Sequence, residues 1–94
     1  MMRARFIVRG RVQGVNFRAA AVREATARGL TGCVWNTADD AVELIAEGDA
    51  SSLAAFGAWL AHGPRMAHVE RVDRSDLDGA VRYQDFRVAY AAPE

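Results

Sequence analysis

The stretch G-R-V-Q-G-V-N-F-R, residues 10–18, decides how the chain begins to fold, because it joins a short apolar strand to an alanine-rich helix. Two glycines, Gly10 and Gly14, flank a run of backbone amides, and Arg18 stands in the first helical turn. Free N–H groups, the positive end of a helix dipole and a guanidinium can converge on one oxyanion. The stretch therefore predicts a site for a phosphate group, in a small enzyme or binding protein.

Hydrophobic periodicity predicts the elements on either side of this stretch. The strand over 3–10 is expected to place apolar residues on one face and arginines on the other: Ala4, Phe6 and Val8 against Arg3, Arg5 and Arg9. The other expected elements are a helix over 17–28 ended by Gly29, strands 30–36 and 42–47 joined by a turn at 38–41, a helix capped by Asp49 and ended by Gly63-Pro64, a strand over 67–74, a polar turn at 75–80 and a last strand over 82–90.

This order, β-α-β-β-α-β with a further C-terminal strand, predicts an α+β fold of the ferredoxin-like, split-βαβ type. Two helices would pack on one face of an antiparallel sheet. Residues 1–94 are expected to form a single domain with a radius of gyration of about 12 Å. Because this fold hosts many unrelated functions, it does not by itself identify an activity.

Composition excludes several classes of function. Twelve acidic and twelve basic residues give a formal net charge of zero, which argues against nonspecific nucleic-acid binding. All twelve basic residues are arginine, so lysine Schiff-base and Walker-type lysine chemistry are excluded. Cys33 is the only cysteine, and no apolar stretch approaches the roughly 20 residues of a membrane span or forms a signal peptide. We expect a cytoplasmic protein without a membrane partner.

Four segments give the chain a resemblance to the acylphosphatase family over nearly its full length. They are V-R-G-R-V-Q-G-V-N-F-R at 8–18, G-C-V-W-N-T at 32–37, the Gly63-Pro64 passage and F-R-V-A-Y at 86–90. The chain departs from the family pattern at Cys33, where tryptophan is common, at Trp35, and at Asp40, where glycine is usual in the hairpin turn.

The resemblance implies hydrolysis of small acyl phosphates to a carboxylate and inorganic phosphate by a monomer, with no metal, cofactor or covalent intermediate. It implies that Arg18 binds the phosphate and that Asn36 orients the attacking water. Thr37 is expected to assist by orienting the Asn36 amide through its hydroxyl. The substrate-binding loop implied by position consists of Arg11, Val12, Gln13, Gly14, Val15 and Asn16, whose backbone amides would form the phosphate cradle.

Two other functions remain as alternatives at this stage. One is a noncatalytic module that binds RNA or a small anion, although exposed aromatics and net positive charge would be expected of an RNA reader. The other is the acylphosphatase-like domain of a larger carbamoyl-transferring maturation enzyme. We expect a chain with its own start to stand alone, and this expectation disfavours the second alternative. The sequence does not choose among acetyl phosphate, carbamoyl phosphate and 1,3-bisphosphoglycerate as substrates.

Other reactive side chains favour structural roles. A Cys33 nucleophile of the tyrosine-phosphatase kind would need an arginine six residues later, where Asp39 stands instead. His62 and His68 have no cysteine or carboxylate placed to complete a metal site and are expected at the surface. Asp39 and Asp40 are explained by a hairpin turn.

Overall fold

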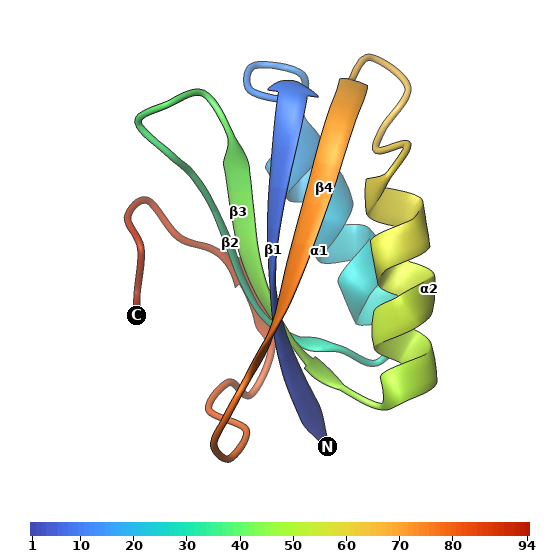
Figure 1. Ribbon diagram of the computed structural model, residues 1–94, viewed down its shortest axis with the longest axis vertical. Coiled ribbons are helices and arrows are strands. Elements are labelled where there is room, and N and C mark those ends of the chain that lie inside the picture. The colour runs from blue at the N-terminus through green and yellow to red at the C-terminus, as the bar shows by residue number, and fades with distance from the viewer.

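The computed structural model describes residues 1–94 and contains two helices and five strands in the predicted order (Figure 1). The elements are β1 (Met2–Arg11), α1 (Phe17–Ala27), β2 (Thr31–Asn36), β3 (Val42–Gly48), α2 (Ala50–Leu60), β4 (His68–Leu77) and β5 (Phe86–Val88). The radius of gyration is 11.8 Å. Neither helix is long and apolar enough to cross a membrane.

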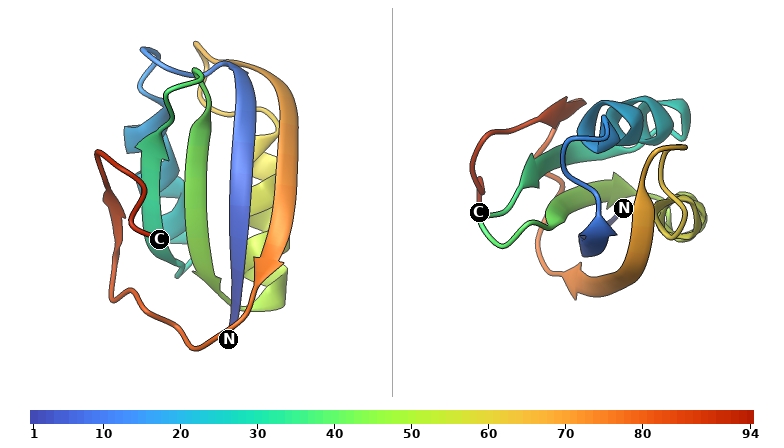
Figure 2. Two further views of the ribbon diagram at one scale, coloured as in Figure 1. Left: turned by 60° about the vertical axis from the view of Figure 1, so that its left-hand side comes forward. Right: turned by 90° about the horizontal axis from the view of Figure 1, so that it is seen from above.

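The five strands form one sheet in the order β4-β1-β3-β2-β5, with both helices on the same side of it (Figure 2). This arrangement confirms the ferredoxin-like α+β fold, and one detail is corrected. The pairs β4/β1, β1/β3 and β3/β2 are antiparallel, but β5 runs parallel to β2, so the sheet is mixed. The reason is topological. The last residue of β4 and the first residue of β2 lie at the same end of the sheet. A chain that crosses the sheet at that end therefore begins β5 beside the start of β2 and runs in the same direction.

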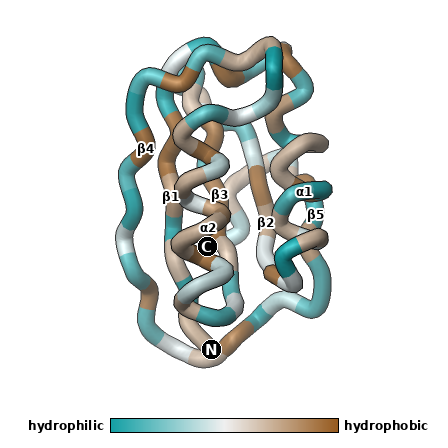
Figure 3. Tube along the Cα trace, turned by 90° about the vertical axis from the view of Figure 1, so that its right-hand side faces the viewer, coloured by the Kyte–Doolittle hydropathy of each residue, from teal (hydrophilic) through white to brown (hydrophobic).

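The main core lies between the sheet and the helices. On β1, the side chains of Ala4, Phe6 and Val8 are buried as predicted, and the three central strands are the most hydrophobic part of the sheet (Figure 3). The Phe56 ring of α2 contacts the Phe6 ring edge-on, with 6.0 Å between centroids, and also meets Phe86 of β5. These contacts hold α2 against both the centre and the edge of the sheet.

Three local expectations are wrong. The segment 75–77 belongs to β4, because Ser75 and Leu77 pair with Arg5 and Arg3 of β1 instead of forming a turn. The last strand covers only Phe86–Val88, since the preceding residues are used in crossing from one edge of the sheet to the other. Asp49 does precede the first residue of α2, but its carboxylate makes no capping hydrogen bond.

A buried ion pair lies on the face of the sheet opposite the helices, the face on which β1 was expected to place its arginines. Arg3 is only 3% exposed, and its guanidinium donates hydrogen bonds to Glu47 and Glu94, each at 2.7 Å. Burial alone would raise the pKa of Glu47, but hydrogen bonds from Arg3 and from the backbone amides of Arg82 and Tyr83 outweigh burial and lower that pKa. The network fastens the segment 78–94 onto this face.

Candidate active site

The loop between β1 and α1 has a backbone shape that glycine and asparagine permit. Gly10 adopts a φ of 131° at a β-bulge one residue before the end of β1. Gly14 and Asn16 adopt left-handed conformations with φ values of 75° and 65°. Asparagine tolerates this region better than most residues, which explains how α1 can begin directly after it.

The backbone N–H groups of this loop have no acceptor within the protein. From Val12 to Ala19 none donates a hydrogen bond to another backbone group, and the first helical bond runs from Ala20 N to Asn16 O at 3.1 Å. The Asn16 side chain does not cap the helix either. A row of free donors at the positive end of a helix dipole favours an anion at this position.

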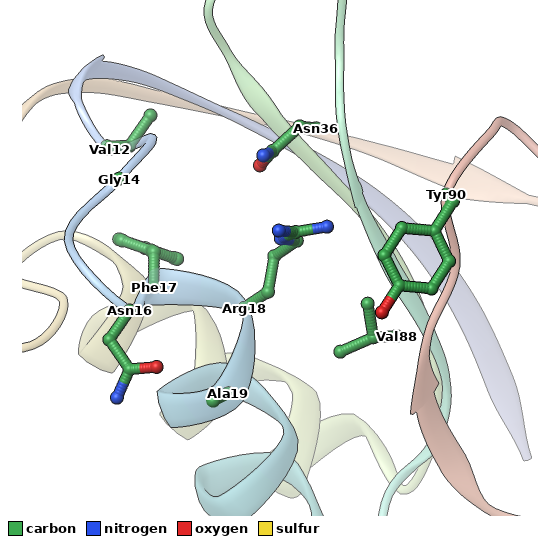
Figure 4. Close-up of a pocket in the computed structure, with 9 residues that line it drawn as sticks. All are labelled: Val12, Gly14, Asn16, Phe17, Arg18, Ala19, Asn36, Val88 and Tyr90. Atoms are coloured by element: carbon green, nitrogen blue, oxygen red, sulfur yellow. The ribbon is translucent and has the colours of Figure 1, made fainter.

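Arg18 extends from the first turn of α1 toward Asn36 and Tyr90 (Figure 4). Its guanidinium carbon lies 5.6 Å from the centroid of the Tyr90 ring, within the range of a cation–π contact. No ion pair in the structure involves Arg18. Its charge is therefore available to a ligand.

Asn36 is the last residue of β2, and its amide faces the same space as the Arg18 guanidinium (Figure 4). Its Oδ1 atom is buried and has no hydrogen-bond partner in the protein. An unsatisfied buried acceptor costs about 1–3 kcal/mol, so such an atom is usually completed by a ligand or an ordered water. Asn36 thus lines the site and carries an acceptor that the protein does not use.

The Gln13 side chain connects the loop to the β2–β3 hairpin through two hydrogen bonds. Its Nε2 donates to the backbone oxygens of Thr37 and Ala41, both at 2.9 Å. The Thr37 hydroxyl is occupied within the hairpin turn, where it accepts a hydrogen bond from Ala41 N at 3.0 Å and donates to Asp39. The expectation that this hydroxyl orients the Asn36 amide is therefore wrong, and Gln13 is the side chain that joins the two segments.

These segments enclose a surface cavity of about 340 Å³. Of the residues proposed from sequence, five line the cavity: Val12, Gly14, Asn16, Arg18 and Asn36. Four others do not: Arg11, Gln13, Val15 and Thr37. The remaining lining residues, Phe17, Ala19, Val88 and Tyr90, were missed as site residues. The last two could be found only from the pairing of β5 with β2, which brings the C-terminal segment beside Asn36.

Charge distinguishes this cavity from the second cavity of the protein. Arg18 is the only charged side chain in its lining, whereas the arginines of a second, polar cavity are paired, Arg82 with Glu94 and Arg87 with Asp85. Cys33 lies elsewhere in a small cluster with Trp35 and Ile45, and burial raises the pKa of its thiol, which disfavours the nucleophilic thiolate. The cavity therefore fits a small anion.

Comparisons with known proteins identify the relatives of this chain. The sequence profile of one family, described as acylphosphatase, matches residues 4–88. An acylphosphatase of Mannheimia succiniciproducens is 42% identical over 90 residues, a match that covers 96% of this chain and 100% of the relative. The solved acylphosphatase of Bacillus subtilis has a TM-score of 0.92 at 34% identity and covers 96% of this chain and 100% of its own. A HypF structure from T. kodakarensis has a TM-score of 0.82 at 27% identity, over 98% of this chain but 12% of that longer protein.

Proposed function

The chain belongs to the acylphosphatase family, and from that premise we propose how its cavity cleaves the carboxyl–phosphate bond of a small acyl phosphate. The reaction is the hydrolysis of an acyl phosphate to a carboxylate and inorganic phosphate. The observation that carries the proposed mechanism is that Asn36, whose Oδ1 has no hydrogen-bond partner, and Arg18, whose guanidinium has no ion-pair partner, line one cavity beside a row of free backbone N–H groups.

Phosphate binding falls to the loop and to Arg18. The free amides between Val12 and Asn16 donate to the phosphate oxygens, and the planar guanidinium holds two of those oxygens at once. In the transition state of phosphoryl transfer, negative charge is spread over the equatorial oxygens. Donors fixed by the fold around these oxygens stabilise that charge without rearranging.

Asn36 positions the attacking water. Its Oδ1 accepts a hydrogen bond from the water, while its NH₂ group is available to a phosphate oxygen. A carboxylate at this position would be a stronger base but would repel the phosphate dianion. The neutral amide therefore orients the nucleophile without weakening substrate binding.

The substrate makes further catalytic groups unnecessary, because a carboxylate is already a good leaving group. Alignment of the water and stabilisation of the equatorial oxygens are the two effects on which phosphoryl transfer generally depends. The cavity lining supplies a guanidinium, amides and apolar side chains for this task. We accordingly propose that the reaction needs no metal and forms no phosphoenzyme. We also propose that the protein acts as a monomer in the cytoplasm.

Substitution of the two side chains tests this mechanism. Arg18→Ala and Asn36→Ala should each lower kcat for benzoyl phosphate by about 10²–10³-fold, the usual effect of removing a transition-state donor. Arg18→Lys should recover only part of the activity, because an ammonium cannot hold two oxygens in a planar fork. Hydrolysis is measured spectrophotometrically with EDTA in the buffer, and circular dichroism establishes that each variant is folded.

Arg23→Ala is the matched control, since Arg23 lies exposed on the same helix, outside the cavity. Its turnover should equal that of the unaltered protein. Near-normal turnover in either alanine variant at Arg18 or Asn36 would contradict the assigned roles. Phosphate binding without any turnover by the unaltered protein would indicate an anion-binding module instead.

A further inference from the structure

The cavity has a wall that the hydrolytic mechanism does not use. Val88 of β5 and Tyr90, two residues after it, line the cavity, while the loop of 12–16 and Asn36 supply its polar side (Figure 4). Ala19 of α1 adds a further apolar side chain to the lining. The cavity is thus polar on one side and apolar on another, with the Arg18 guanidinium between them.

Tyr90 is unusually open for a large aromatic residue. It is 87% exposed, although its ring contacts the Arg18 guanidinium. Most of the ring surface is therefore free to contact a ligand held at Arg18. The absence of any acidic or second basic side chain from the cavity lining means that a charged acyl substituent would find no ionic partner there.

The geometry of phosphoryl transfer directs the acyl group toward this wall. The attacking water and the leaving group occupy opposite sides of phosphorus. In Figure 4 Asn36 and Val88 lie on opposite sides of the Arg18 guanidinium. We place the leaving carboxylate and its substituent, which point away from the water at Asn36, on the side of the cavity that Ala19, Val88 and Tyr90 line.

We propose that Tyr90 and Val88 form a subsite for the acyl group and select substrates with a neutral, apolar and preferably flat substituent. The inference rests on the proposed function, because it takes the orientation of the substrate from the assigned positions of phosphate and water. Aromatic acyl groups stack on the Tyr90 ring, whereas an acetyl group is too small to use it.

A competing role for Tyr90 is to hold Arg18 in place through the cation–π contact alone. That role would affect every substrate equally, since all of them carry the same phosphate. Selectivity between acyl groups separates the two roles.

The test compares benzoyl phosphate with acetyl phosphate in Tyr90→Ala, Tyr90→Phe and the unaltered protein. The ratio of kcat/KM for the two substrates should fall about three- to tenfold in Tyr90→Ala, the size of one aromatic stacking contact. In Tyr90→Phe, which keeps the ring, the ratio should equal that of the unaltered protein. Val81→Ala, a truncation of a 40% exposed apolar residue outside the cavity, should leave the ratio unchanged.

Calorimetric binding of phenylphosphonate and methylphosphonate gives the same comparison without turnover. The unaltered protein should bind phenylphosphonate more tightly, and Tyr90→Ala should remove the difference. The subsite would be overturned if Tyr90→Ala lowered kcat/KM equally for benzoyl phosphate and acetyl phosphate. It would also be overturned if the unaltered protein bound the two phosphonates equally tightly. A protein that hydrolyses neither substrate yet prefers phenylphosphonate would retain the subsite and lose the proposed function.

Discussion

Arg18 and Asn36 are side chains whose charge does not change in the neutral range of pH, because an amide does not titrate and a guanidinium stays protonated. Neither His62 nor His68 lines the cavity, and both are exposed. We therefore expect kcat/KM for benzoyl phosphate to be nearly constant between about pH 5 and 8, once ionisation of the substrate is taken into account. Initial rates across this range provide the measurement.

A bell-shaped profile in the same range would assign a proton-transfer role to a histidine. His62→Gln and His68→Gln serve as controls, and both should reproduce the profile of the unaltered protein. A profile flattened by either substitution would contradict the mechanism.

Asp40 shows how a single departure from the family pattern is absorbed. The resemblance leads us to expect glycine here, and Asp40 adopts a left-handed conformation with a φ of 69°. The turn nevertheless closes, with a hydrogen bond from Thr37 N to Ala41 O at 2.9 Å. Aspartate is among the few residues that tolerate this region, so the turn that follows Asn36 closes without a glycine at this position.

At the scale of elements, the end of β1 controls the shape of the phosphate-binding loop. A Cβ atom on Gly10 would meet the backbone oxygen of His68 and the backbone nitrogen of Glu70 in β4, and the φ of 131° is unfavourable for any side chain. Backbone atoms cannot move aside as a flexible side chain would. We expect Gly10→Ala to lower the free energy of unfolding by about 3 kcal/mol and to lower activity further by displacing the loop.

Urea denaturation and the hydrolysis assay measure these two effects. Gly79→Ala is the matched control, because Gly79 also has a positive φ, of 97°, but no atom lies near the added Cβ. Its expected loss is about 1 kcal/mol, from conformational strain alone, with unchanged activity. Equal destabilisation by the two substitutions would refute the role of the close approach between β1 and β4.

At the scale of the whole molecule, the Arg3–Glu47–Glu94 network makes stability depend on acid pH. Burial opposes ionisation of Glu94, but hydrogen bonds from the side chains of Arg3 and Tyr83 outweigh burial and lower the pKa of Glu94. The pKa of Glu47 is lowered in the same way, by Arg3 and by two backbone amides. A lowered carboxyl pKa in the folded state contributes stability that is complete above the ordinary value of 4.5. That contribution is lost as the pH falls from there through the lowered value.

Glu47→Gln tests this dependence. At about pH 7 the variant should lose about 3 kcal/mol of unfolding free energy, because Arg3 keeps its buried charge but loses a carboxylate partner. Between about pH 5 and 3 its stability should fall less steeply than that of the unaltered protein, since one titrating group is gone. Urea titrations at several pH values measure both.

An exposed ion pair supplies the control for that experiment. Asp73 pairs with Arg71 on the surface of β4 at 2.9 Å. Asp73→Asn should change stability by less than about 0.5 kcal/mol. An acid dependence of Glu47→Gln identical to that of the unaltered protein would show that Glu47 does not contribute to it.

Local sequence signals determined the order of the elements, their inward faces and the loop at 10–18. The alternation of Ala4, Phe6 and Val8 and the change to helical spacing at Phe17 are properties of neighbouring residues, so they could be read without the fold. The same is true of the residue types proposed for phosphate and water, Arg18 and Asn36, because both stand in continuous motifs.

Only the tertiary structure decided which distant groups meet. The sequence placed Arg3 on the arginine face of β1, but nothing nearby in sequence reveals that Glu47 and Glu94 bind it there. The parallel pairing of β5, and with it the position of Tyr90 beside Arg18, follows from where the chain crosses the sheet. Periodicity reports which face of an element is buried, whereas the partners on that face depend on contacts between segments far apart in the chain.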